Sequence, residues 1–140
     1  MATRALPFGI DIEVRNVFET DFSKKDISGV LFQYPDTEGS ILDFEGVVKE
    51  AQKYGVGNSR ITQERYNSNL DLSQTLTVCA TDLLALTILK PPGEFGVDIA
   101  VGTSQRLGVP LFFGGPHAGF FACKEKYVRL MPGRMVGVTR

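Results

Sequence analysis

The sequence is poor in the residues that usually build metal and redox centres. Its 140 residues include one histidine, His117, and two cysteines, Cys79 and Cys123. The cysteines lack Cys-x-x-Cys spacing and lie in apolar runs, so we expect buried, reduced thiols; a disulfide would require their strands to be neighbours. The motifs of a P-loop, a dinucleotide-binding fold and a serine hydrolase are also absent. The sequence therefore predicts no metal centre and none of these three catalytic architectures.

Charge and hydropathy argue against two further classes of partner. The formal net charge is −1, with 15 basic and 16 acidic residues, and no basic cluster alternates with aromatic residues. We therefore expect neither nucleic acid nor an anionic membrane surface as the main partner. No apolar run approaches the ~20 residues of a membrane-spanning helix. The opening residues MATRALPFGIDIEV hold one arginine and no long apolar stretch, so we expect no signal or transit peptide.

The sequence does contain strand-like and helix-like segments in alternation. Helices are predicted from Ser40, with Asp43 in the first turn and Gly55 as the stop, and at residues 83–89 and 125–131. This order predicts an α/β domain with a mostly parallel sheet, and 43% hydrophobic residues suffice for its core. The predicted strands are residues 9–14, 29–32, 76–80, 97–102, 120–123 and 135–138.

The segment 57–74 departs from this alternation. It is rich in asparagine and serine, has no sustained hydrophobic period, and is predicted to be a loop. Structureless loops beyond ~12–15 residues are uncommon inside compact domains. The segment is therefore a lid, an insertion or an artefact of how the coding sequence was joined. We expect it to be mobile, dispensable and the first site of limited proteolysis.

Two predicted strands are followed by residues that are candidates for a ligand site. Asp82 follows one of them and Ser104, Gln105 and Arg106 follow the next. Ligands of open α/β sheets bind beyond the carboxyl ends of the strands. There Asp82 can pair with a protonated ring nitrogen or cap the next helix, and its spacing favours capping.

Fold-type-I pyridoxal enzymes show a similar spacing. In them, one strand ends in an aspartate for the pyridine nitrogen, and about twenty residues later another ends near the cofactor lysine. Gln105 or Arg106 stands where that lysine is needed. Neither can form an imine, because an amide nitrogen is not nucleophilic and a guanidinium stays protonated. The spacing suggests a pyridoxal-type domain that does not hold the cofactor by itself.

A glycine-rich segment, FFGGPHAGFF, surrounds the only histidine. Successive backbone N–H groups around Gly114 and Gly115 can cradle an anion. The alternative is a tight turn that uses the backbone freedom of the two glycines, and residue types alone favour it. His117 is more often structural in such a setting than catalytic, and an imidazole at a subunit interface is the intermediate interpretation.

Three long strings resemble one known family. VLFQYPDTEG, ATDLLALTILKPPGEFGVDIAVGTSQRLGVP and GGPHAGFFACKEKYVRLMPGRMVGVT are similar to the N-terminal half of the glycine decarboxylases, the P-proteins of the glycine cleavage system. The resemblance runs from about Thr3 to Arg140 with one interruption. Three differences stand out: the polar residues 57–74, Leu107 where the family usually has Phe, and Phe112 and Phe113 where it has Gly-Tyr.

The resemblance implies a pyridoxal-phosphate enzyme with two similar halves on one chain or on two subunits. Only the C-terminal half carries the cofactor lysine. The enzyme is an oxidoreductase of glycine catabolism that decarboxylates glycine and passes the aminomethyl group to the lipoyl arm of the H-protein. The pyridoxal ring acts as electron sink. The N-terminal half packs against the catalytic half and helps to wall its site. Mitochondrial residence follows for a eukaryotic source, and cytoplasmic residence otherwise.

We therefore expect residues 1–140 to be an incomplete large domain of the fold-type-I pyridoxal-phosphate-transferase type, with an insertion at about 57–74. The chain is expected to be inactive alone, to bind no cofactor by itself and to need the catalytic half. The alternative is a non-catalytic interaction module that docks on a complete pyridoxal enzyme. The residues expected at the site wall or interface are Asp82, Ser104, Gln105, Arg106, Gly114, Gly115 and His117.

Overall fold

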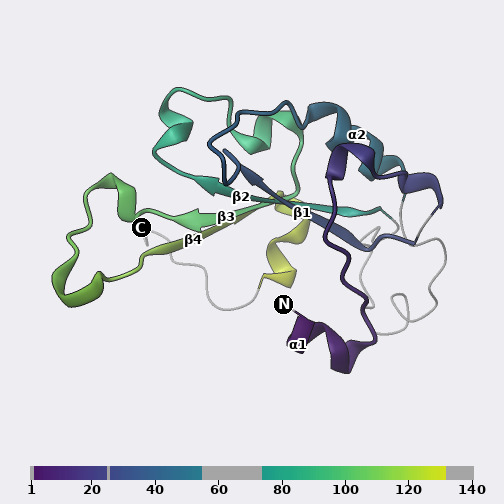
Figure 1. Cartoon of the computed structure of the whole chain (residues 1–140), viewed down its shortest axis with the longest axis horizontal. Coiled ribbons are helices and arrows are strands. Elements are labelled where there is room, and N and C mark those ends of the chain that lie inside the picture. The colour runs from purple at the N-terminus through teal and green to yellow at the C-terminus, as the bar shows by residue number, and fades with distance from the viewer. Residues whose placement is uncertain (1, 25, 55–73, 132–140) are drawn as a thin grey trace.

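A four-stranded sheet organises the part of the chain that the structure describes. The computed structural model describes residues 2–24, 26–54 and 74–131. Within these residues the strands lie in the order β1-β2-β3-β4 (Figure 1). Their bounds are Gly29–Tyr34 for β1, Leu76–Asp82 for β2, Ile99–Thr103 for β3 and Gly119–Cys123 for β4.

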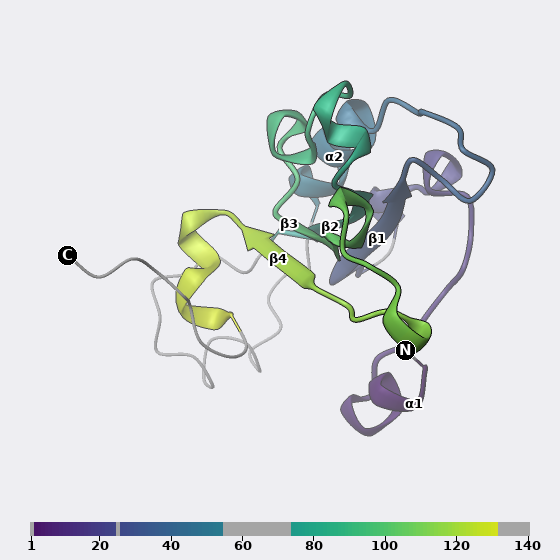
Figure 2. The same ribbon diagram turned by 90° about the vertical axis from the view of Figure 1, so that its left-hand side faces the viewer.

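The strand directions confirm the predicted mixed α/β fold with a mostly parallel sheet. β1, β2 and β3 run parallel to one another, and β4 is antiparallel to β3. Four of the six predicted strands are present, although β3 begins two residues later than expected. A parallel pair needs a crossover, whereas antiparallel neighbours can be joined by a loop. The long loop between β3 and β4 makes the second kind of connection and extends beyond the end of the sheet (Figures 1 and 2).

One face of the sheet carries the hydrophobic core. Helix α2 (Glu45–Lys53) and the short turn η5 (Pro92–Phe95) cover this face (Figure 1). The ring of Phe44 stacks on Phe32 of β1 at 4.1 Å between centroids, and Phe18 stacks on its other side at 5.2 Å. The buried members of this core are Phe32, Tyr34, Phe44, Val48, Cys79, Phe95 and Val97.

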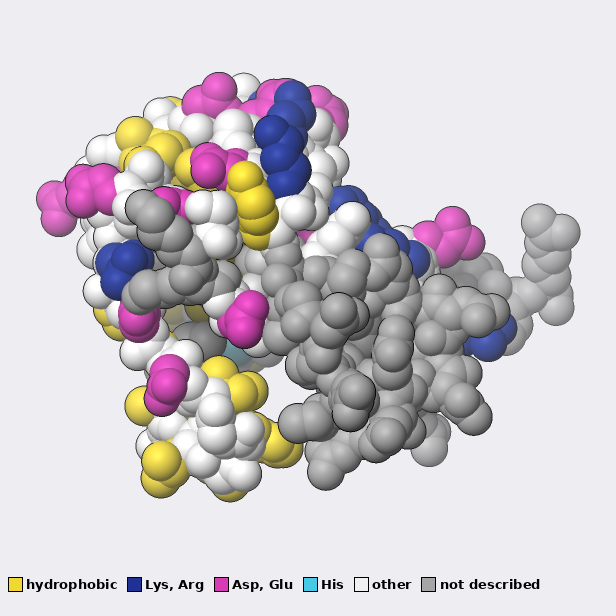
Figure 3. All heavy atoms as spheres, turned by 90° about the vertical axis from the view of Figure 1, so that its right-hand side faces the viewer, with side chains coloured by type: hydrophobic (Ala, Val, Ile, Leu, Met, Phe, Trp, Pro, Cys, Tyr) yellow, Lys and Arg dark blue, Asp and Glu magenta, His cyan; other side chains and the backbone are white. Residues whose placement is uncertain are grey.

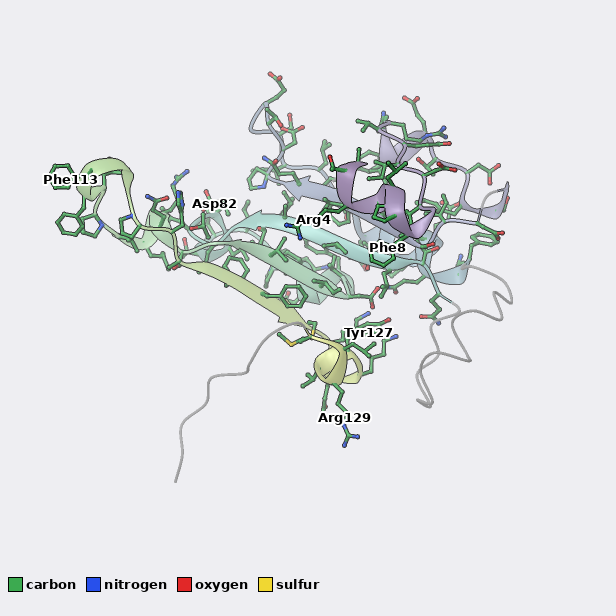
Figure 4. All side chains as sticks on the ribbon, turned by 90° about the horizontal axis from the view of Figure 1, so that it is seen from below. Arg4, Phe8, Asp82, Phe113, Tyr127 and Arg129 are labelled. Carbon is green, nitrogen blue, oxygen red and sulfur yellow. The ribbon has the colours of Figure 1, made fainter. Side chains whose placement is uncertain are left out.

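The other face of the sheet is much more open to solvent. Its side chains come from the alternate positions of the same strands, because successive strand residues point to opposite faces. Leu31 of β1 is 48% exposed and Phe121 of β4 is 41% exposed. Helix α1 (Ala2–Ala5) and the turn η8 (Glu125–Leu130) lie on this side, below the sheet in Figure 1. Figure 4 shows the same side from below.

The predicted helices are shorter than the sequence suggested. The helix expected from Ser40 begins at Glu45 instead. Before it the Asp36 carboxylate accepts the backbone N–H of Ser40 at 2.7 Å and closes a loop. Asp43 then accepts the N–H of Glu45 at 2.9 Å. The helix predicted at 83–89 is a single 3-10 turn, η4 (Ala85–Thr87), and that at 125–131 is the 3-10 turn η8. The prolines that follow η4 leave no room for a longer helix.

The strand predicted at residues 9–14 was wrong. This segment has no regular secondary structure and is not part of the four-stranded sheet. Its alternating apolar side chains are exposed instead of facing a partner; they are Ile10, Ile12 and Val14, and Leu6 and Phe8 just before them are exposed as well. Figure 3 shows apolar side chains gathered on this N-terminal part, at the bottom of the view. An alternating pattern of apolar side chains does not by itself produce a strand when the backbone is not paired with the edge of a sheet.

Two sequence predictions lie outside the described residues. These are the loop at 57–74, except for its last residue, and the strand at 135–138. Both cysteines are free. Cys79 is buried as predicted, and burial raises the pKa of its thiol to about 12, whereas Cys123 is only half-buried. In the described residues no helix is long and apolar enough to cross a membrane.

Candidate functional site

The carboxyl ends of β2 and β3 bring together the polar residues that the sequence singled out. β2 and β3 are parallel neighbours, and Asp82 is paired with Thr103 at their last residues. Asp82 therefore lies beside the turn η6 (Gln105–Leu107), which follows β3 after one residue. Figure 4 shows Asp82 at this end of the sheet. The carboxyl edge of a parallel sheet is where open α/β folds bind their ligands.

The Asp82 carboxylate is held by two groups of the chain itself. Its Oδ1 accepts the backbone N–H of Leu84 at 3.1 Å, so it caps the turn after β2. Its Oδ2 lies 3.2 Å from the Arg106 guanidinium. The Asp82 side chain is 26% exposed and that of Arg106 is 64% exposed, so solvent screens this ion pair. Asp82 combines the capping role that its spacing favoured with a charge partner that the sequence analysis missed.

Ser104 and Gln105 tie the end of β3 to the loop that precedes β4. The backbone N–H and the hydroxyl of Ser104 both donate to the Ala118 carbonyl, at 2.8 and 3.1 Å. The backbone N–H of Gln105 donates to Oγ1 of Thr103 at 3.2 Å. A Cβ added to Gly115 would lie 2.6 Å from Nε2 of Gln105, so the glutamine side chain lies against the loop backbone. These contacts use the backbone N–H groups of both residues and the hydroxyl of Ser104 within the chain.

The glycine-rich loop forms tight turns. The N–H groups of Gly114 and Gly115 donate to the carbonyls of Leu111 and Phe112 at 3.0 and 3.1 Å, which leaves them no hydrogen for an anion. Both glycines have positive φ, 121° and 85°, which favours glycine there. Phe113 also has positive φ, 45°, and its ring is fully exposed at the tip of the loop (Figure 4). His117 is exposed on the same loop.

Two lysines that could offer an amine are engaged away from this edge. Lys90 forms a 2.8 Å ion pair with Glu45 at the start of α2, and this hydrogen bond raises the pKa of Lys90. Lys124 follows β4 and pairs with Asp98, which precedes β3. The Lys124 amine therefore lies at the opposite end of β3 from Arg106. Neither amine is available next to Asp82.

Sequence reasoning missed a buried polar centre around Asp98. Asp98 is 2% exposed and accepts hydrogen bonds from the backbone and hydroxyl of Thr77, from Gln52 and from Lys124, at 2.8 to 3.1 Å. Burial by itself raises the pKa of Asp98, but the bonds from Lys124 and Thr77 outweigh it and hold the pKa below its usual value. A charged residue within an apolar strand-like run was the available signal. This centre joins α2, β2 and the start of β3, so its geometry is that of a structural anchor.

Other kinds of site find little support in the described residues. Across residues 2–24, 26–54 and 74–131 no group of three or more His, Cys, Asp and Glu is placed to hold a metal ion. A surface hollow is lined by residues of the N-terminal segment, from Glu13 to Glu19. It does not include the Asp82 cluster, by which we mean Asp82, Ser104, Gln105 and Arg106. The Asp82 cluster therefore remains the candidate site because of its place at the sheet edge.

The chain is similar to a well-defined group of proteins. A family model described as "Glycine cleavage system P-protein" matches residues 1–140. Mitochondrial glycine dehydrogenase (decarboxylating) from Mus musculus is 57% identical over 138 residues, which cover 99% of this chain and 12% of that protein. The protein of the same name from Homo sapiens is 56% identical over 138 residues, with the same coverage. Glycine dehydrogenase (decarboxylating) from Bdellovibrio bacteriovorus is 45% identical over 139 residues. The chain spans about 12% of the length of these relatives.

A solved structure agrees with the sequence comparison. It is a crystal structure of glycine decarboxylase (P-protein) of the glycine cleavage system, in inhibitor-bound form. The TM-score is 0.61 at 38% sequence identity, and the match covers 79% of this chain and 21% of that chain. The sheet described above is therefore similar to part of a solved P-protein.

Proposed function

Because this chain belongs to the glycine cleavage system P-protein family, we propose that it is part of the N-terminal, non-catalytic half of a glycine decarboxylase. The proposed reaction of the whole protein is the decarboxylation of glycine with transfer of the aminomethyl group to the lipoyl H-protein. The chain spans only about 12% of its relatives. We therefore propose that it is inactive alone and contributes structure to a site completed by the catalytic half.

The observation that carries this proposal is the chemistry at the ends of β2 and β3. Pyridoxal phosphate requires an amine for its covalent attachment and acts as an electron sink when bound. Gln105 and Arg106 stand at the end of β3, and the carboxylate of Asp82 already has two partners. The residues present at this edge therefore do not fit the cofactor. We propose that the C-terminal half holds it.

The residues at this edge are proposed to wall the site or to contact the other half. They are Asp82, Ser104, Gln105, Arg106, Gly114, Gly115 and His117. What supports a contact role is the loop between β3 and β4, which carries the glycines and His117 and extends beyond the sheet end (Figure 1). Exposed apolar side chains on that loop, among them Leu111 and Phe113, suit packing against another surface.

We also propose that residues 1–140 are one incomplete domain of the pyridoxal-phosphate-transferase type. In this proposal residues 57–74 are an insertion relative to the family. The animal and plant relatives are named mitochondrial, whereas the bacterial one is not. Mitochondrial residence is accordingly proposed for a eukaryotic source, and cytoplasmic residence otherwise.

A segment exchange tests the proposed function. The segment of the Mus musculus relative that matches this chain is replaced by this chain, once with and once without residues 57–74. The release of carbon dioxide from labelled glycine is then measured with H-protein present. We expect both exchanged proteins to be active, the second at least as active as the first. Loss of activity in both, with the proteins folded, would count against the assignment.

The isolated chain provides the matched control for this exchange. We expect no release of carbon dioxide from labelled glycine by the wild type, by Gln105→Lys or by Arg106→Lys, because an added amine does not supply the missing half. Release above background by either variant, at a rate proportional to its concentration, would show that the other half is not essential.

The second candidate function is a stand-alone interaction module that docks on a complete pyridoxal enzyme. The exposed apolar loop between β3 and β4 favours it, because such a surface suits a partner. The two candidates differ in how the isolated chain behaves. A module is expected to be soluble and monomeric with a cooperative thermal transition at every concentration, whereas an incomplete domain is expected to aggregate as its concentration rises or to require the rest of the protein.

A further inference from the structure

We propose that the Arg106 guanidinium occupies the place that a cofactor ring would take on Asp82, so that the chain itself closes this edge of the sheet. The inference rests on the proposed function, since it concerns the edge that corresponds to a cofactor site. It goes further because it names the Arg106 guanidinium as the group that binds the Asp82 carboxylate. A missing lysine explains only why covalent attachment fails, whereas this ion pair also removes the non-covalent charge contact.

The geometry that supports the inference comes from two adjacent strands. Asp82 is the last residue of β2, and Arg106 lies in the turn just after β3. The parallel register pairs Asp82 with Thr103, which brings the turn beside the carboxylate. The guanidinium Nη1 lies 3.2 Å from Oδ2, and Oδ1 is used by the N–H of Leu84. Both oxygens of Asp82 thus have a donor from within the chain.

The chemistry of the two donors is closely similar. A protonated pyridine nitrogen offers a carboxylate one positively charged N–H group. A guanidinium offers the same kind of group and stays protonated at all physiological pH values. Arg106 therefore supplies Asp82 permanently with the charge that a bound ring would supply only when present. A ring nitrogen would have to compete with Arg106 for this carboxylate.

The residues next to Arg106 in the chain contact the loop between β3 and β4. The side chain of Gln105 lies against Gly115, where an added Cβ would meet Nε2 at 2.6 Å. Ser104 holds the same loop through the Ala118 carbonyl. Arg106 thus binds Asp82 from the turn η6, and the neighbouring residues of that segment, Ser104 and Gln105, hold the loop before β4.

The test uses pyridoxamine 5′-phosphate, which has the cofactor's ring and phosphate but no aldehyde to label surface lysines. Its binding is followed by its own fluorescence anisotropy with the wild type, Asp82→Asn, Arg106→Met and the double variant. We expect no saturable binding by the wild type or by Asp82→Asn up to millimolar ligand. Arg106→Met is expected to bind at least tenfold more tightly than the wild type, and the double variant to lose that gain.

Phenyl phosphate is the matched control ligand, because it has an aromatic ring and a phosphate but no ring nitrogen. We expect Arg106→Met to gain nothing for it. Arg106 is largely exposed, so the variant should keep its circular dichroism spectrum; Arg106→Gln replaces it if it does not. A saturable complex of the wild type that Asp82→Asn weakens would overturn the inference. So would an Arg106→Met protein that binds no better than the wild type. Neither result bears on the segment exchange, which tests the proposed function separately.

Discussion

The two faces of the sheet are built from the same strands, yet only one of them is completed within the described residues. On the covered face, Phe32, Cys79 and Thr77 are buried under α2 and η5. On the open face, Leu31 and Phe121 are nearly half exposed. The contrast cannot come from strand composition alone, because both faces carry apolar side chains. It comes from what each face has to pack against.

The difference indicates which part of the domain is self-sufficient. Parallel strands are normally buried on both faces, because their crossover helices lie on both. Here α2 and the short turns after β2 supply one layer, whereas among residues 2–24, 26–54 and 74–131 the open face has only the helix α1 and the turn η8 on its side (Figures 1 and 4). This difference between the two faces supports the proposal that residues 1–140 form an incomplete domain. Substitutions on the two faces should therefore have very different effects.

The largest effect is expected from Phe44→Ala on the covered side. Phe44 is 4% exposed and stacks between Phe32 and Phe18. Removing its ring leaves a cavity between three aromatic neighbours and should lower the free energy of unfolding by about 3 kcal/mol or more. Urea unfolding followed by circular dichroism measures this change.

The matched control is Leu31→Ala on the open face. Leu31 already contacts solvent over about half of its surface, so its truncation should change the free energy of unfolding by less than about 1 kcal/mol. If the two truncations cost the same, the open face is covered in solution, and the contrast between the faces does not hold.

The second effect, expected to be smaller, comes from the polar part of the covered side. Asp98→Asn leaves Lys124 without its charge partner and weakens the bonds from Thr77 and Gln52, and about 2 kcal/mol of stability should be lost at pH 7. Because the folded pKa of Asp98 lies below the usual 3.8, its contribution is present above that pH. It disappears as the pH falls through the folded pKa.

Urea unfolding from pH 7 to pH 2 measures the Asp98 effect. The stability difference between the wild type and Asp98→Asn should be constant above about pH 4 and should shrink below it. Lys124 is partly exposed, so high salt should reduce its share of the difference. A difference that grows toward low pH would show that folding raises the pKa of Asp98 instead of lowering it, contrary to its contacts.

The parts of the fold that the sequence predicted are those specified by local pattern and burial together. The apolar runs from Gly29 and from Leu76 became β1 and β2, and Val48 and Ala51 became the buried face of α2, with the buried Phe44 just before it. Helix starts were predicted less well. Ser40 has the residue type of a cap, but residues 40–44 have no regular structure and α2 begins at Glu45, where Asp43 accepts the backbone N–H. Which of several polar residues precedes a helix depends on the turn geometry, which residue types do not reveal.

In the candidate site, too, the sequence predicted the features that follow from local pattern and missed those that depend on the geometry of the folded chain. Strand ends and spacing predicted that Asp82 would lie near Ser104, Gln105 and Arg106, since parallel neighbours end at one edge. The Asp82–Arg106 pair was not predicted, because it depends on the turn after β3 and on the direction of a long side chain. The Asp98 centre was missed for a related reason: its donors, from Gln52 to Lys124, are far apart in sequence and meet only in the folded chain.

The smallest effect is expected on the outer surface of the covering layer, at Glu45. Its carboxylate pairs with Lys49 at 2.6 Å and with Lys90 at 2.8 Å, and these hydrogen bonds lower the pKa of Glu45 from 4.5 to about 2. The three side chains are solvent-accessible, so water and salt screen most of the attraction. Glu45→Gln should therefore lower the melting temperature only slightly at low salt, and not detectably in 1 M salt.

The pH dependence of the Glu45 pair follows from the sign of its pKa shift. A lowered pKa means that the contribution is present above about pH 4.5 and is lost as the pH falls toward 2. Melting curves of the wild type and Glu45→Gln should thus differ slightly at pH 7 and converge at pH 2. Lys49→Gln leaves the Lys90 pair intact and should have a smaller effect than Glu45→Gln. If Glu45→Gln instead rivals Phe44→Ala at every salt concentration, the layer over the covered face depends on charge as much as on apolar packing.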